Sequence, residues 1–203
     1  MFATAAAIAL ALVAGPGVAR AEESAATRSV RVANETMSKL LRATSKPGSA
    51  AEKKRAGKVT SQLRGFLDVD ELGKLALVDH WDGLSEDQRT EYSTLLRNLI
   101  EANYIKGLRA NLDYKVKYLG ERKRGDSVVV ETEIATKKNK RTLTISIEYV
   151  LRPDGKTYRA VDVVTDGVGL VENYRAQFNR IISKEGFEGL LKRMRGKLEA
   201  ISS

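Results

Sequence analysis

The chain has 203 residues, 42% of them hydrophobic and 6% aromatic, and 35 Lys and Arg residues stand against 26 Asp and Glu residues. This length suits one domain with a sizeable core. The lack of cysteine excludes a disulfide framework, a thiolate metal site and a cysteine nucleophile.

The first 21 residues have the pattern of an export signal. An apolar run over 5–14 is followed by Pro16, and Ala19 and Ala21 form an A-x-A-type cleavage site. A membrane-spanning helix needs about 20 apolar residues, and Pro16 with its flanking glycines ends this run earlier. No Lys or Arg precedes the run. We therefore expect a signal peptide over 1–21 that is cleaved after Ala21.

Helices dominate the first half of the mature chain. Apolar residues recur at helical spacing over 28–41, 50–65 and 70–80. The segment Ser85-Glu-Asp-Gln88 is a capping box, in which a serine hydroxyl and a glutamine side chain satisfy backbone amides at a helix start. The helix that follows is predicted to extend to about residue 108, because its apolar residues form one broad face.

From residue 112 the apolar period changes from helical spacing to two. Strict alternation predicts strands over 112–118, 128–134, 143–151 and 156–164, joined by short polar connections. Such strands pair as an antiparallel meander with one apolar face.

Two further helices, over 168–184 and 187–201, are predicted to close the chain, with Gly186 at the C′ position of the first. The fold class is therefore α+β: N-terminal helices, a four-stranded antiparallel meander sheet and two C-terminal helices. We expect a single domain over 22–203, mostly helical over 22–111, with the sheet and the C-terminal helices over 112–203.

Few residues suggest catalysis or metal binding. His80 is the single histidine, and beside Trp81 it is more typical of a packed or capping residue than of a catalyst. One histidine without cysteine argues against a zinc site. Asp162 and Asp166 flank the end of the last strand, where turn and cap roles beside Gly167 are favoured over paired acid–base catalysis.

The net charge of +9 does not by itself indicate a nucleic-acid partner. Lys and Arg residues are scattered over every predicted element, and no aromatic pair on adjacent strands forms an RNA-binding pattern. A positive charge also suits a protein that works between anionic membrane surfaces or that docks on acidic partners. We expect no nucleic acid among its partners.

Four sequence blocks stand in a fixed order: Phe66-Leu-Asp-Val-Asp70, Leu75-Ala-Leu-Val-Asp-His-Trp81, Leu84-Ser-Glu-Asp-Gln-Arg89 and Gly167-Val-Gly-Leu-Val-Glu-Asn-Tyr-Arg-Ala-Gln-Phe178. In this order and spacing they resemble the MlaC family of periplasmic phospholipid carriers, also called the toluene-tolerance family, over roughly residues 66–198. The chain departs from the family pattern at Gly169, where serine is usual, and at Tyr158, where tryptophan is common. It also carries Asp79 and Asp82 at positions that are often basic.

The resemblance implies a soluble periplasmic shuttle that is not an enzyme. Such a protein acts as a monomer, uses no cofactor and holds a phospholipid as cargo. It would carry that lipid between an outer-membrane lipoprotein complex and an inner-membrane ABC transporter complex, and so support outer-membrane lipid asymmetry. The resemblance further implies an apolar pocket between sheet and helices with a polar mouth. The residues expected to bind lipid are Ile145, Ile147, Tyr149, Val168, Val171, Tyr174 and Phe178.

Two alternatives stay open at the level of sequence. A small-molecule enzyme would use Asp162 or Asp166 as a base in an apolar pocket. A periplasmic adaptor with a filled core would bind protein only.

Overall fold

The computed structural model describes residues 23–107, 114–138 and 141–202. The predicted signal peptide over 1–21 lies outside the described residues. The elements in chain order are α1 (Ala25–Arg42), α2 (Ala50–Phe66), α3 (Val69–Ala76), the 3-10 helix η1 (Trp81–Gly83), α4 (Glu86–Gly107), β1 (Tyr114–Arg124), β2 (Ser127–Lys138), β3 (Arg141–Asp154), β4 (Thr157–Thr165), β5 (Val168–Gly169) and α5 (Leu170–Ser202). This order confirms the predicted α+β class.

The strands form one antiparallel sheet in the order β1-β2-β3-β4-β5. The sheet has five strands where the sequence predicted four, because Val168 and Gly169 pair with the end of β4. Asp166 and Gly167 have positive φ angles of 47° and 83° and so reverse the chain tightly enough for this pairing. Val168 therefore lies in a strand and not at the start of a helix.

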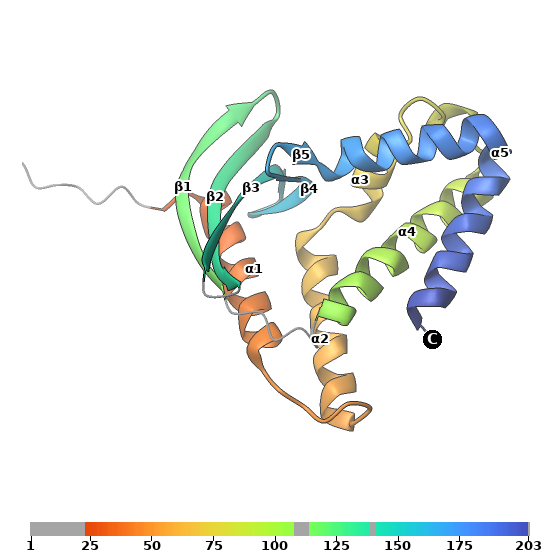
Figure 1. Ribbon diagram of the computed structural model, residues 1–203. Coiled ribbons are helices and arrows are strands. Elements are labelled where there is room, and N and C mark those ends of the chain that lie inside the picture. The colour runs from red at the N-terminus through yellow and green to blue at the C-terminus, as the bar shows by residue number, and fades with distance from the viewer. Residues whose placement is uncertain (1–22, 108–113, 139–140, 203) are drawn as a thin grey trace, which may run out of the picture.

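The helices lie in two groups beside the sheet (Figure 1). One group is the α1–α2 hairpin, in which α1 packs against α2 and against β4. The other group contains α4 and α5, which pack on each other, with α3 touching both. Within α5 the chain changes direction at Gly186, whose φ angle is 70°. The two predicted C-terminal helices are thus the two segments of α5.

Side-chain caps fix the helix starts, and α4 begins with the predicted capping box. The Gln88 backbone amide donates to the Ser85 hydroxyl at 3.2 Å, and the Ser85 amide donates to Oε1 of Gln88 at 3.1 Å. The first three helices are capped in the same way by Ser24, Ser49 and Asp68. These bonds satisfy backbone amides that have no partner within the helix.

An aromatic cluster holds the second helix group together. Tyr92 of α4 is completely buried, its hydroxyl donates to the Gly73 carbonyl at 3.1 Å, and its ring lies 5.7 Å from that of Phe178. Burial raises the pKa of the Tyr92 hydroxyl above its ordinary value. The members of the aromatic cluster are Trp81, Tyr92, Tyr174, Phe178 and Phe187.

The face of the sheet that points away from α1 carries charged residues, but part of it is buried. Arg122 bridges Glu131 and Glu148 there, with nitrogen–oxygen distances of 2.8 Å to each carboxylate. Three buried valines on the same face, Val129, Val150 and Val161, pack against Leu75 of α3. The short helix α3 thus covers part of a face that alternation alone would leave to solvent.

Candidate functional site

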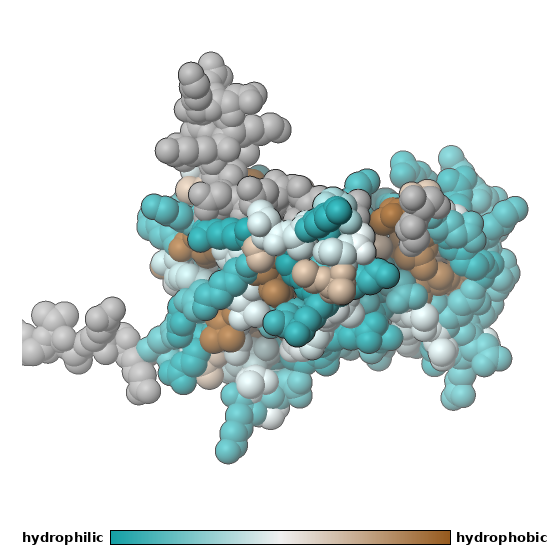
Figure 2. Space-filling model, turned by 90° about the horizontal axis from the view of Figure 1, so that it is seen from below, coloured by the Kyte–Doolittle hydropathy of each residue, from teal (hydrophilic) through white to brown (hydrophobic). Residues whose placement is uncertain are grey.

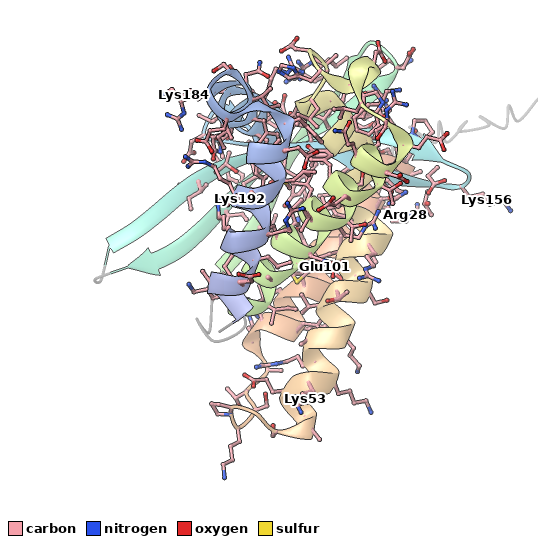
Figure 3. All side chains as sticks on the ribbon, turned by 90° about the vertical axis from the view of Figure 1, so that its right-hand side faces the viewer. Arg28, Lys53, Glu101, Lys156, Lys184 and Lys192 are labelled. Carbon is pink, nitrogen blue, oxygen red and sulfur yellow. The ribbon has the colours of Figure 1, made fainter. Side chains whose placement is uncertain are left out.

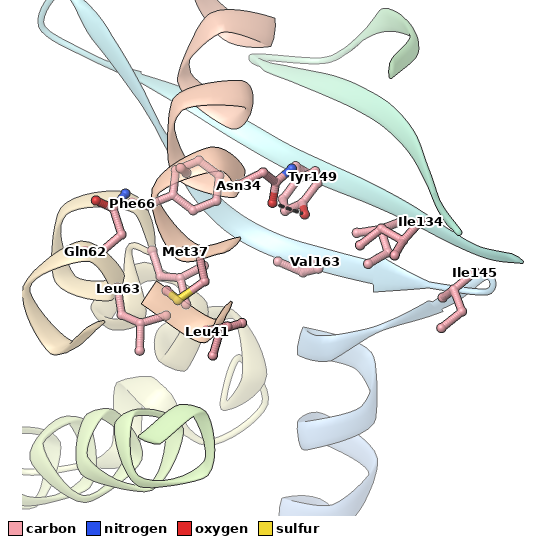
Figure 4. Close-up of a pocket in the computed structure, with 13 residues that line it drawn as sticks. Asn34, Met37, Leu41, Gln62, Leu63, Phe66, Ile134, Ile145, Tyr149 and Val163 are labelled. Carbon is pink, nitrogen blue, oxygen red and sulfur yellow. Dashed lines mark hydrogen bonds between the residues drawn. The ribbon is translucent and has the colours of Figure 1, made fainter. Parts of the chain in front are cut away.

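A cavity of about 300 Å³ lies between α1, α2 and the inner face of the sheet (Figure 4). This volume is at the lower end of the usual range for small-molecule sites, about 300–1,000 Å³. The lining is almost entirely apolar: Ala33, Asn34, Met37, Leu41, Gln62, Leu63, Phe66, Leu67, Ile134, Ile145, Ile147, Tyr149 and Val163. Such a space suits an apolar ligand.

The regular spacing of each element directs these side chains into the cavity. Helix α1 supplies Ala33, Met37 and Leu41, which recur every four residues and therefore lie on one face. Strand β3 supplies Ile145 and Ile147, which alternate with exposed residues. The cavity thus arises where one helix stripe faces one side of the sheet.

The wall of the cavity contains a polar contact that the protein satisfies internally. The Tyr149 hydroxyl donates to Oδ1 of Asn34 at 3.0 Å, and Nδ2 of Asn34 lies 3.5 Å from the Tyr118 hydroxyl. Burial raises the pKa of the Tyr118 hydroxyl, and its bond with Asn34 opposes that rise. The ring of Phe66 meets the Tyr149 ring edge-on at 5.8 Å. Because Asn34 is bonded within the wall, it leaves the space itself apolar.

The described residues around the cavity carry no acid–base constellation. Neither a carboxylate, an imidazole, an ammonium nor a guanidinium is among the described side chains that line it. His80 lies elsewhere, with Nε2 2.9 Å from Oδ1 of Asn179. No group of three or more metal-ligating side chains occurs within residues 23–107, 114–138 and 141–202. The described lining therefore offers mainly apolar contact surface.

Asp162 and Asp166 have the structural roles that the sequence favoured. Oδ1 of Asp162 accepts from the backbone N–H groups of Val163 at 2.8 Å and Val171 at 3.0 Å, and so fixes the start of α5. A Cβ atom at Gly169 would lie 3.0 Å from Oδ2 of Asp162, which explains the small residue there. Oδ1 of Asp166 accepts a 2.9 Å hydrogen bond from a backbone amide of β3.

The structure divides the seven residues that were expected to bind lipid. Ile145, Ile147 and Tyr149 lie together on the cavity wall. The other four lie elsewhere. Val168 is 58% exposed on β5, whereas Val171, Tyr174 and Phe178 of α5 pack in the hydrophobic core. From its start beside Asp162, α5 runs toward α4 and α3, on which it packs, and away from the inner face of the sheet (Figure 1).

The helix side of the cavity was not predicted. Its residues come from α1 and α2, whose apolar stripes look in sequence like ordinary core packing. A signal was present in Asn34 and Gln62, two carboxamides that adjoin the apolar stripes of these helices. That signal is weak, because polar residues flank the apolar stripe of every amphipathic helix.

Within the described ranges, no helix combines the length and apolar character needed to cross a membrane. On the face shown in Figure 2, hydrophilic residues predominate and apolar residues form small separate groups.

The fold and the cavity define an α+β protein that encloses an apolar, ligand-sized space. The model of the family described as MlaC protein matches residues 31–196. The chain therefore belongs to the MlaC family.

Two known proteins illustrate the relationship. A Haemophilus influenzae protein, named intermembrane phospholipid transport system binding protein MlaC, is 21% identical over 138 residues, or 67% of this chain and 64% of that protein. The match thus spans slightly less than two thirds of the relative. A solved structure of a phospholipid-binding protein from Ralstonia solanacearum, in complex with a phospholipid, superposes with a TM-score of 0.71 at 19% identity. That match covers 89% of this chain and 100% of the other, and it shows a shared fold.

Proposed function

We propose that this protein is a periplasmic phospholipid carrier that holds acyl chains between α1, α2 and the sheet. The apolar cavity is the observation that carries the proposal, because its described lining offers contact to hydrocarbon and no catalytic group. Family membership supports it, and so do the phospholipids named for the Haemophilus and Ralstonia relatives. The mature chain over 22–203 would act as a single lipid-binding domain, without a cofactor.

The energetics of the cargo determine how such a carrier works. Burying a methylene group contributes about 0.8 kcal/mol, so each methylene that the cavity takes up adds to the free energy needed to release the lipid into water. Release into solution would therefore be extremely slow, and transfer has to proceed by docking. The partners would be an outer-membrane lipoprotein complex and an inner-membrane ABC transporter complex, met by a monomer after its signal peptide is removed.

The direct test is extraction of freshly purified protein followed by mass spectrometry of the extract. We expect phospholipid at stoichiometric amounts. An empty extract, together with no uptake from phospholipid vesicles, would favour a protein-binding adaptor and would refute the carrier.

A pair of variants locates the cargo. Ile147→Trp places a larger side chain on the cavity wall, and overpacking of about 1–3 kcal/mol corresponds to a loss of bound lipid of about 5- to 150-fold. Val168→Trp is the matched control, because Val168 is exposed on β5 and does not line the cavity. Equal loss of lipid in both variants, with both still folded, would place the cargo elsewhere.

A further inference from the structure

Gln62 of α2 lies where the cavity meets the molecular surface. It lines the cavity and also two outer grooves along the seam between α1 and α2. The first groove, here called the mouth groove, has a volume of about 310 Å³ and is bordered by Arg28, Val32, Ala33, Phe66 and Lys156 together with Gln62. The second groove, here called the seam groove, includes Lys39 and Lys58.

The mouth groove is the more closely joined to the cavity. Ala33, Gln62 and Phe66 line both spaces, whereas the seam groove shares Gln62 alone with the cavity. Three shared residues make the mouth groove the adjoining groove that a molecule extending from the cavity past Gln62 would most readily reach. The lining of the mouth groove includes Val32, which is 49% exposed and offers apolar surface outside the cavity.

The Gln62 carboxamide is available for a ligand. Among the described residues it has no hydrogen-bond partner, whereas Asn34, the other carboxamide of the wall, is bonded to Tyr149. An amide at the edge of an apolar space gains from donating to a carbonyl oxygen, because its hydrogen-bonding capacity is otherwise only partly used. A phospholipid has ester carbonyls at the junction of its acyl chains and its polar end.

Two cations stand at the mouth groove, and Figure 3 shows Arg28 and Lys156 on the same side of the molecule. Lys156 is exposed and has no carboxylate within ion-pair distance among the described residues. Arg28 lies 3.8 Å from Glu23 and keeps 53% of its side chain exposed. Glu23 is bound more closely by Arg31, at 2.8 Å, so the charge of Arg28 is only partly compensated.

We propose that the polar end of the bound phospholipid leaves the cavity past Gln62. In this placement an ester carbonyl accepts from the Gln62 amide, and the phosphate lies in the mouth groove beside Arg28 and Lys156. Charge-assisted contacts to phosphate are stronger than neutral ones, while the apolar floor of the groove contacts the glycerol region. The placement rests on the proposed carrier function and assigns an orientation to its cargo.

Three variants of the mature protein test this placement: Gln62→Leu, the double variant Arg28→Ala/Lys156→Ala, and the control Lys39→Ala/Lys58→Ala. The control also removes two cations, but from the seam groove. Each delipidated protein is offered vesicles containing diester phosphatidylglycerol, its diether analogue or diester diacylglycerol. It is then re-isolated, and the bound lipid is quantified by mass spectrometry. Unchanged thermal midpoints establish that each variant is folded.

The three ligands separate the two contacts. We expect the unaltered protein to prefer the diester over the diether about fivefold, as one hydrogen bond allows, and Gln62→Leu to reduce that ratio to about one. The double variant should lower the loading of phosphatidylglycerol relative to diacylglycerol about fivefold at low salt, and less at high salt. The control should leave both ratios unchanged.

Several results would overturn the placement. It fails if both ratios are unchanged in the test variants, or if they change equally in the control. An equal loss of diacylglycerol from anionic vesicles would assign the two cations to the membrane surface and not to the cargo phosphate. If the unaltered protein takes up no lipid at all, the carrier function itself fails together with the placement.

Discussion

Replacing Asp162 by alanine is predicted to destabilise the protein without changing its chemistry or its cargo. The carboxylate accepts two backbone hydrogen bonds, from Val163 and from Val171, and the second of these anchors the first turn of α5. Asp162 does not line the cavity. Removing the Asp162 carboxylate should therefore change the folding free energy and leave lipid binding unaltered.

The magnitude follows from the two bonds. Losing a helix cap costs about 1 kcal/mol, and leaving the second part-buried amide without its acceptor adds about 1 kcal/mol, so Asp162→Ala should cost about 2 kcal/mol. Asp162→Asn keeps an acceptor oxygen and loses only the charge at the helix start, at about 0.5 kcal/mol. Asp166→Asn should be neutral within about 0.5 kcal/mol, because Asn tolerates the positive φ angle found there.

Urea unfolding followed by circular dichroism measures all three variants. For a chain of this size, about 2 kcal/mol corresponds to a fall of roughly 4–8 °C in the thermal midpoint. Phospholipid loading of each folded variant is measured in parallel and should match the unaltered protein. A stability loss in Asp162→Asn as large as in Asp162→Ala would refute the cap argument. A small-molecule turnover that disappears in either Asp→Asn variant would support the enzyme alternative.

Three further outcomes are expected elsewhere in the molecule. Burial raises the pKa of the Tyr92 hydroxyl, so the stability that the neutral hydroxyl contributes is complete below the unfolded-state pKa and is lost as the pH rises above it. Tyr92→Phe should therefore reduce the loss of folding stability above about pH 10. Urea midpoints across that pH range would contradict this if both proteins declined equally. Arg64→Ala should lower the urea midpoint, because Glu101, which is 8% exposed and lies 2.6 Å from Nε of Arg64, would lose the guanidinium that its carboxylate binds. In the double variant, Glu101→Gln should recover part of the stability lost in Arg64→Ala. If the losses of the two single variants simply add in the double variant, the two side chains do not interact energetically. Phe178→Ala should cost about 3–5 kcal/mol yet leave lipid loading per folded molecule unchanged, and a selective loss of lipid would show that the aromatic cluster reaches the cargo.

Local chemistry made much of the architecture predictable. The Ser85–Gln88 box specified a helix start through bonds between neighbours in sequence, and the alternation around Ile145 and Ile147 specified both a strand and its apolar face. Strand β5 could not be foreseen in this way. Its two residues have no strand pattern of their own and are defined by pairing with β4 after the turn at Asp166.

The cavity was predictable on one side only. Alternation predicted the apolar face of β3, and the family resemblance, not the alternation, predicted a pocket against that face. A helix stripe such as that of Met37 and Leu41 has the same spacing whether it meets another side chain or an empty space. Which helices meet the sheet depends on long-range packing. The start of α5 is fixed by a bond between residues nine apart in sequence, Asp162 and Val171, and its direction depends on packing against α4 and α3.

The aromatic cluster of η1, α4 and α5 shares no residue with the described lining of the cavity. The five rings around Tyr92 therefore make no direct contact with the space beside α1, although they belong to the same hydrophobic core as cavity residues such as Leu63 and Tyr149. Emptying the cavity would remove ligand contacts from the residues that line it and from none of these rings. A carrier arranged in this way can release its lipid without losing the packing of the aromatic cluster. We expect the unloaded protein to stay folded and to return for another lipid, while bound lipid adds stability by mass action.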